Sequence, residues 1–317
     1  MSGKDGAMLL IPRTNQILEL AVKSQLTLAQ EVKSQDPNLD AKEKKKLSPV
    51  SMSFNDFEHS SYRVSMPKGS SVLTISLSLP CFSEIEGQGV SSMLKQKYGE
   101  FLVDTEQGYD VSIAVDVNSP SQPIETITEL VVNLKEAILT APLIKYFKAL
   151  VDGSPESDTF SFNLREDTKM YLCPAKDRVT VVLKLSLQDP VDLQVAEIFL
   201  KDYKEVQRRK AGGAPPALFS LNAPEEIAGE AKGSLGFISF AVQQRQMKDM
   251  QTTAAALINF RSFLQYHLKC SKSFFHSRMR KKVKEFLMIL NRAKTDYEGD
   301  TKKKTKKTAS GRVFKKN

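Results

Sequence analysis

The stretch from Thr252 to Ala293, TTAAALINFRSFLQYHLKCSKSFFHSRMRKKVKEFLMILNRA, contains neither proline nor glycine. Apolar residues recur along it mostly at steps of three or four, which predicts an α-helix with one apolar stripe. The stripe is formed by Leu257, Phe260, Leu264, Leu268, Phe275, Met279, Val283, Phe286 and Leu290. Such a helix is ~60 Å long at 1.5 Å per residue, longer than one small domain can cover. We therefore expect part of the stripe to pack on a second chain; the alternative is that two domains of this chain bury all of it.

The same stretch is strongly basic. Residues 261–294 carry ten Lys and Arg residues against one acid, Glu285, and residues 295–317 carry eight against three acids. The net charge of the whole chain is +9, so residues 1–260 are mildly acidic. A cationic end on an acidic body predicts a polyanionic or acidic partner, which is nucleic acid, anionic lipid or a protein with an acidic surface.

Working toward the N-terminus, hydrophobic periodicity predicts alternating groups of strands and helices. The expected helices span residues 16–32, 84–98, 124–150 and 191–209. The expected strands span residues 50–54, 62–65, 72–79, 111–117, 159–163, 169–173, 178–187, 217–221 and 236–242. Most connections are too short for the crossovers of a parallel sheet. The prediction is an α+β fold of two similar domains, each an antiparallel sheet with helices on one face, followed by the long helix.

A repeat supports this division. A shift of 108 residues, without a gap, aligns Ser53-Phe54-Asn55 with Ser161-Phe162-Asn163, Glu58 with Glu166, and Leu77-Ser78-Leu79 with Leu185-Ser186-Leu187. The Gly153–Asp158 segment, rich in Gly, Pro and Ser, suggests a boundary between the copies. We expect a first domain at 1–152, a second at 153–246, the long basic helix at 247–294 and a disordered Lys-rich tail at 295–317.

The chain shows no motif of an enzyme. Its three cysteines, Cys81, Cys173 and Cys270, are widely spaced, so we expect buried, reduced thiols in a cytosolic protein. His267 and Cys270 lie three residues apart, but no further ligand is placed to complete a zinc site. The glycine-rich segment 229–236 lacks the spacing of a nucleotide loop. We predict no catalytic residue, no metal site and no cofactor.

The run YHLKCSKSFFHSRMRKKVKEFLMILNRA (Tyr266–Ala293) resembles the C-terminal helix of the subunit 2 family, the roughly 34-kilodalton core subunit of the actin-related protein 2/3 complex. Two further stretches agree with that family, Tyr98–Ser112 with YGEFLV and GYDVS, and KDRVTVV from Lys176 to Val182. The resemblance runs in order from about Leu9 to Ala293. The first residues, the linker at 33–48 and the Lys-rich tail depart from the family.

The resemblance implies a structural subunit that catalyses no reaction. Its long helix would pair antiparallel with the matching helix of subunit 4, and the pair would carry the two actin-related subunits. The side of the helix that carries Lys and Arg residues, here called the basic side, would bind an existing actin filament, from which the complex nucleates a branch. The filament-binding candidates carried over from the motif are Lys269, Lys272, Arg278, Arg280 and Lys281. The implied location is the cytoplasm, at the actin cytoskeleton of the cell cortex and projections.

The alternative is a polyanion-binding protein, in which the basic helix and tail bind nucleic acid or anionic lipid. Nucleic-acid binding calls for aromatic residues that stack among the bases. Phe274 is available, but Phe275 and Phe286 belong to the packing stripe. We therefore expect no nucleic acid, and keep anionic lipid as a possible further partner.

Overall fold

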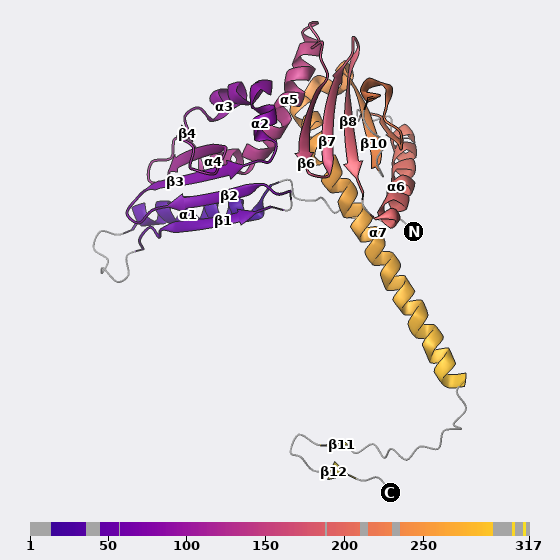
Figure 1. Ribbon diagram of the computed structural model, residues 1–317. Coiled ribbons are helices and arrows are strands. Elements are labelled where there is room, and N and C mark those ends of the chain that lie inside the picture. The colour runs from indigo at the N-terminus through magenta and orange to yellow at the C-terminus, as the bar shows by residue number, and fades with distance from the viewer. Residues whose placement is uncertain are drawn as a thin grey trace. The chain divides into compact units, whose positions relative to one another are not determined.

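The computed structural model describes most of the chain (Figure 1). The described residues are 14–35, 45–56, 58–187, 189–209, 215–229 and 235–293, with two short segments at 306–307 and 313–314. The chain divides into two compact units, residues 1–266 and residues 267–317. Both sheets lie in the first unit, so the domain boundaries expected at residues 152, 246 and 294 stay predictions.

The first sheet has five antiparallel strands in the order β1-β2-β3-β5-β4. They are β1 (Val50–Asn55), β2 (Ser61–Met66), β3 (Val72–Ser78), β4 (Leu102–Val103) and β5 (Val111–Asp116). The alternation of the strands buries one row of apolar side chains, in which Val64, Ile75 and Ile113 are paired across neighbouring strands and fully buried. The two-residue β4 was not predicted, because so short a pairing leaves no periodic signal.

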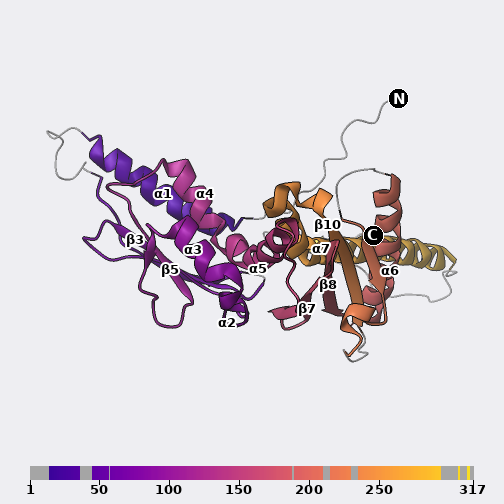
Figure 2. The same ribbon diagram turned by 90° about the horizontal axis from the view of Figure 1, so that it is seen from above.

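Helices cover the apolar face of this sheet. Helices α1 (Gln16–Lys33) and α4 (Ile124–Val132) lie side by side over it (Figure 2). Asn15 begins α1 as an N-cap whose side chain accepts hydrogen bonds from the amides of Ile17 and Leu18. Leu18, Val22 and Leu26 of α1 are buried, as the periodicity predicts for a helix with one apolar side.

The other face of the first sheet is polar. The hydroxyls of Ser76 on β3 and Ser112 on β5 lie 2.8 Å apart, and Ser76 donates to Glu106 at 2.8 Å. Ser112 accepts a hydrogen bond from the Glu106 amide at 3.0 Å. Hydrogen bonds therefore tie the β4–β5 loop to the sheet.

The segment expected to be one helix at 84–98 is divided. It forms α2 (Phe82–Ile85), the π-turn η1 (Glu86–Val90) and α3 (Ser91–Tyr98). Gly89 has φ +88° and marks the kink, since few other residues adopt this conformation readily.

The expected single helix at 124–150 is also wrong, because α4 ends before Asn133 and α5 (Leu134–Val151) begins after it. Asn133 has φ −89° and ψ 2°, outside helical values, and asparagine is a poor former of helix interiors.

The second sheet repeats the first, in the order β6-β7-β8-β10-β9. Its strands are β6 (Phe160–Arg165), β7 (Thr168–Pro174), β8 (Arg178–Ser186), β9 (Ala217–Ser220) and β10 (Leu235–Gln243). Helix α6 (Pro190–Arg209) lies beside β9, and the turn η2 (Glu225–Ile227) follows β9. The chain then passes through η3 (Gln244–Asp249) into α7 (Met250–Ala293). Two antiparallel sheets with helices and a long final helix confirm the predicted α+β class.

Both faces of the second sheet carry buried apolar residues. On one face, the Phe240 ring of β10 meets the Phe260 ring of α7 edge-on, with centroids 4.8 Å apart. On the other face, Tyr171, Cys173, Val182, Ile227 and Phe237 form a buried cluster. The second sheet thus lies between the final helix and the η2 segment.

Strand pairing corrects the repeat alignment. The first hairpins of the two repeats keep the shift of 108 residues. On the next strand, Tyr62 pairs with Leu77, whereas Met170 pairs with Leu183. The connection between these strands is two residues shorter in the second repeat, so the gap-free equivalence of Leu77 with Leu185 is wrong.

The predicted disordered tail at 295–317 falls almost entirely outside the described residues. Its two described segments, β11 (Lys306–Lys307) and β12 (Val313–Phe314), pair antiparallel.

Candidate interaction helix

Helix α7 has two segments with the same apolar periodicity and different surroundings. We call residues 250–268 the inner segment and residues 269–292 the outer segment. In the inner segment, Leu257, Phe260, Leu264 and Leu268 are buried. The chain by itself therefore buries four of the nine residues assigned to partner packing. For these four, the alternative of burial within the chain is correct.

Two consecutive polar residues hold the inner segment to corresponding turns of the two repeats. Arg261 is 8% exposed; its Nε donates to Thr168 Oγ1 at 2.5 Å, and its guanidinium pairs with Asp167. Asp167 and Thr168 lie at the β6–β7 turn. Ser262 donates to Glu58 at 2.5 Å, and Glu58 lies in the β1–β2 turn.

A lysine completes this cluster. Lys135 at the start of α5 donates to both Glu58 and Asp56 at 2.6 Å. Burial alone would raise the pKa of Glu58, but the Lys135 charge and the hydrogen bonds from Lys135 and Ser262 outweigh it and hold that pKa below its usual value. The pKa of Arg261 is lowered, first by burial and then by the nearby Arg165 charge, while Asp167 opposes the shift.

Sequence reasoning missed this cluster. The repeat alignment paired Glu58 with Glu166, which lies next to Asp167, and so marked the two turns as equivalent. Nothing in the sequence indicated that both turns contact consecutive residues of α7.

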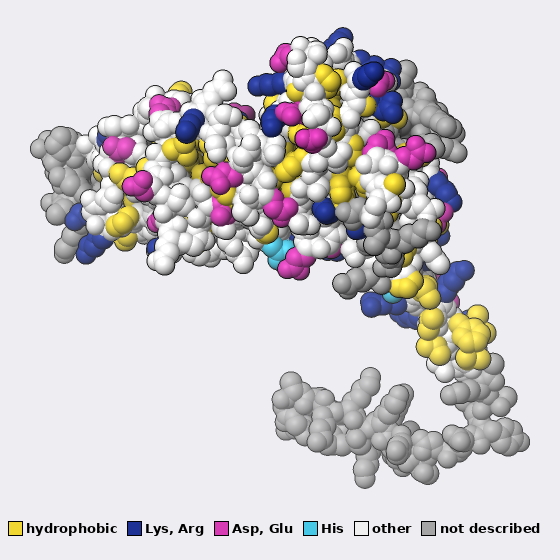
Figure 3. Space-filling model, turned by 45° about the horizontal axis from the view of Figure 1, so that its top comes forward, with side chains coloured by type: hydrophobic (Ala, Val, Ile, Leu, Met, Phe, Trp, Pro, Cys, Tyr) yellow, Lys and Arg dark blue, Asp and Glu magenta, His cyan; other side chains and the backbone are white. Residues whose placement is uncertain are grey.

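From Ser273 to Arg292 every residue of the outer segment is exposed, so this part of the helix is exposed on all sides. Its apolar residues occupy the continuation of the inner stripe. The five predicted packing residues are exposed by 44–64%: Phe275, Met279, Val283, Phe286 and Leu290. Figure 3 shows apolar and basic side chains next to one another along the exposed helix. An uncovered stripe of this length in an amphipathic helix is typical of an interaction surface.

The five predicted filament-binding residues do not share one environment. Lys269, Arg278, Arg280 and Lys281 are exposed, whereas Lys272 is half-buried. Lys272 lies four residues after Leu268 and three before Phe275, so it interrupts the apolar stripe.

The outer segment carries further exposed residues beside the predicted ones. Lys282 and Lys284 are exposed and were not among the predicted residues. The guanidinium of Arg278 lies 4.8 Å from the centroid of the Phe274 ring. This cation–π contact keeps an exposed aromatic residue within the basic side of the helix.

The three cysteines differ in burial, although all three were expected to be buried. Cys81 and Cys173 are buried, and burial raises the pKa of Cys81 to about 12 and that of Cys173 to about 11. Both are therefore protonated, unreactive thiols at neutral pH. Cys270 is exposed, so the expectation that all three are buried is wrong for it. It lies in the outer segment, next to the exposed Lys269.

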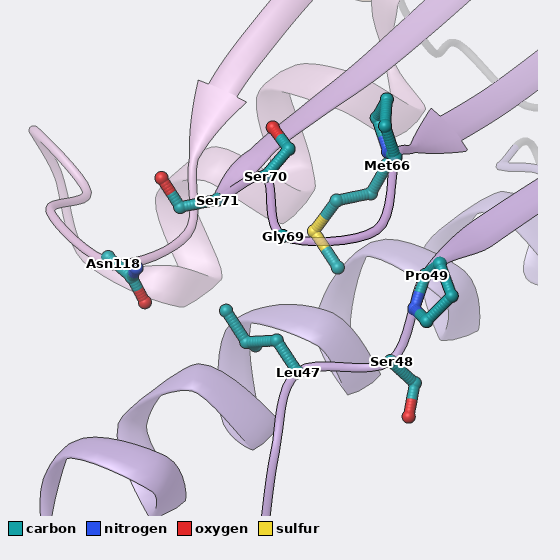
Figure 4. A pocket seen from close by; sticks show the side chains of 9 residues that line it. Leu47, Ser48, Pro49, Met66, Gly69, Ser70, Ser71 and Asn118 are labelled. Atoms are coloured by element: carbon teal, nitrogen blue, oxygen red, sulfur yellow. The ribbon is translucent and has the colours of Figure 1, made fainter.

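A pocket of about 190 Å³ lies between the segment before β1, the β2–β3 turn and the end of β5 (Figure 4). Its lining is Leu47, Ser48, Pro49, Met66, Pro67, Gly69, Ser70, Ser71 and Asn118. Its polar side chains are the hydroxyls of the three serines and the amide of Asn118.

Within the described ranges, no cluster of three or more His, Cys, Asp or Glu residues is arranged to hold a metal ion. Among the helices of that part of the chain, none is both long and apolar enough to span a membrane.

Comparison with known proteins finds similar sequences over most of the chain. Residues 75–297 match the family model described as the Arp2/3 complex 34 kD subunit, p34-Arc. Actin-related protein 2/3 complex subunit 2 of Schizosaccharomyces pombe is 30% identical over 295 residues, covering 84% of this chain and 92% of that protein. The subunit 2 of Dictyostelium discoideum is 31% identical over 271 residues, covering 83% of this chain and 90% of that protein. The matched range begins within β3 and includes all later strands of both sheets and the whole of α7, so the chain belongs to the p34-Arc family.

Proposed function

We propose that this chain is a structural core subunit of an actin-related protein 2/3 complex, which nucleates branched actin filaments. The observation that supports this most directly is the outer segment of α7, whose exposed apolar stripe runs beside exposed bases. The stripe needs a cover in water, and a matching amphipathic helix provides one. By family resemblance, the partner is subunit 4 in an antiparallel heterodimer that carries the two actin-related subunits.

The five exposed stripe residues named above are the proposed contacts to the partner helix. The four inner residues need no partner, because they are already buried. Lys272 lies on the stripe side, so we assign it to the border of the partner helix, where a lysine can extend its charged end into water.

The basic side is the proposed contact with the mother filament. Lys269, Arg278, Arg280 and Lys281 are exposed, and the described segment around them carries a single acid, Glu285. Opposite charges on an acidic actin surface would speed association and fix the register, and salt would weaken them. This role requires no catalytic group or cofactor. It places the chain in the cytoplasm, at the actin cytoskeleton.

The test separates the two surfaces by mutation. Met279→Glu/Phe286→Glu should abolish pairing with subunit 4 in co-expression, because it places charges in the stripe. Lys269→Glu/Arg280→Glu should keep pairing and assembly but lower co-sedimentation of the assembled complex with actin filaments by at least about tenfold at low salt.

The matched control is Lys23→Glu/Lys95→Glu, which reverses the same amount of charge at exposed positions on α1 and α3. It should leave both properties unchanged. Loss of pairing in the Lys269→Glu/Arg280→Glu variant would instead identify the basic side as the dimer interface. Capture of RNA or anionic vesicles without actin-related subunits would favour the polyanion-binding alternative.

A further inference from the structure

Two serine hydroxyls lie among the bases of the outer segment. Ser273 and Ser277 are both exposed. They are four residues apart, so they lie on the same side of the helix, one turn above the other. Lys269 precedes Ser273 by four residues, and Arg280 and Lys281 follow Ser277 by three and four.

This side of the helix is separate from the apolar stripe. Ser277 is two residues from both Phe275 and Met279, and residues two apart on a helix do not face the same way. The hydroxyl of Ser277 therefore points away from the proposed partner helix. It stays accessible when the stripe is covered.

We propose that Ser277 is a phosphorylation site that switches off filament binding by the basic side of α7. The co-reactant is Mg²⁺-bound ATP on a protein kinase that selects basic substrates. The Oγ of Ser277 attacks the γ-phosphorus, the bond from that phosphorus to the β,γ-bridging oxygen breaks, ADP leaves, and the hydroxyl proton passes to the kinase base.

The charges around Ser277 fit this chemistry. Arg278, Arg280 and Lys281 follow it closely, and all three are exposed. From Ser273 to Arg292 every residue is exposed within the described chain, and helices in proteins draw most of their stability from tertiary packing. The segment can therefore open locally to enter a kinase cleft, above all before a partner helix pairs with it.

The product would act on specific cations. A phosphoserine carries a charge of about −1.5 to −2 at neutral pH. At position 277 it would pair with Arg280 at i+3 and Lys281 at i+4, with the anion N-terminal to the base, which is the favourable order. Two of the four exposed filament-binding candidates would be neutralised within the helix itself. This inference rests on the filament-binding role proposed above.

The test begins with the full-length chain, incubated with Mg²⁺-ATP and a purified kinase specific for basic substrates. Phosphate should be found at Ser277 by mass spectrometry, and Ser277→Ala should lose most of it. The assembled complex carrying Ser277→Asp should then bind actin filaments about tenfold more weakly at low salt, with the deficit shrinking as salt rises.

Three controls separate the charge from other effects. Ser277→Asn, the neutral counterpart of Asp, should bind like the unchanged complex. Ser273→Asp should have a smaller effect, because Lys269 is its one predicted filament-binding cation at helical spacing. Ser91→Asp, an exposed serine on α3, should have none.

The outcomes distinguish this inference from the proposed function. If Lys269→Glu/Arg280→Glu weakens filament binding but Ser277→Asp does not, the phosphorylation switch is wrong and the filament contact stands. If neither variant changes filament binding, the filament contact itself fails. Equal phosphate incorporation by Ser277→Ala and the unchanged chain would overturn the site directly.

Discussion

The inner and outer segments of α7 carry one apolar pattern into two environments. Phe260 in the inner segment is 6% exposed and stacks edge-on against Phe240 of the second sheet. Phe286 in the outer segment continues the stripe but is 60% exposed. The comparison shows that helical periodicity reveals which face seeks burial, but not which molecule supplies the cover.

The two segments also differ in how their cations are placed. Arg261 is buried and bonded to Asp167 and Thr168 of the second repeat. Lys269, two turns later, is exposed. In composition the two residues belong to one basic run, yet one supports the fold and the other is available to a partner.

The largest expected difference between the segments concerns their phenylalanines. Phe260→Ala should lower the free energy of unfolding by about 3–5 kcal/mol, because it removes a buried ring and leaves a cavity. Phe286→Ala should change it by less than about 0.5 kcal/mol in the chain alone, because its ring is exposed. Urea unfolding followed by circular dichroism compares the two. Equal losses would mean that the outer stripe is already packed within the chain.

A smaller difference is expected for the cations. Arg261→Met keeps most of the side-chain volume but removes the guanidinium that donates to the buried Thr168 hydroxyl and pairs with Asp167. The free energy of unfolding should fall by about 1–3 kcal/mol. Lys269→Met in the outer segment should leave it unchanged. The same urea titration measures both, and an unaffected Arg261→Met variant would show that the turns do not hold the helix.

The smallest expected effect is a pH dependence at the β1–β2 turn. The pKa of Glu58 is lowered in the folded chain, so its charged form adds stability above its ordinary pKa, and this is lost as pH falls through the lowered value. The contribution should be on the order of 1 kcal/mol. Glu58→Gln should therefore flatten the acid side of the stability profile.

Glu129→Gln is the matched control for this profile, because Glu129 is exposed on α4. Its acid profile should follow that of the unchanged chain. If the Glu58→Gln variant keeps the full acid dependence, other carboxylates are responsible for it.

Much of the fold could be predicted, because it is encoded in local patterns. Alternating strands, helical stripes and the 108-residue repeat predicted two antiparallel sheets and the continuous final helix. The break at Asn133 and the kink at Gly89 were missed, since neither interrupts the apolar periodicity strongly. The shorter connection between β7 and β8 was not predicted, because a few identical residues in an alignment do not define strand register. The pairing of Met170 with Leu183 in the structure does define it.

The sequence by itself determined that α7 is one long amphipathic helix, that its C-terminal part is basic and to which family the residues are similar. Only the tertiary structure decided that the stripe residues from Leu257 to Leu268 are covered by the chain, that Arg261 and Ser262 are held by two equivalent turns, and that Lys272 is half-buried. The reason is physical: periodicity and charge are properties of a chain segment. Burial and pairing depend on groups that come from distant parts of the sequence.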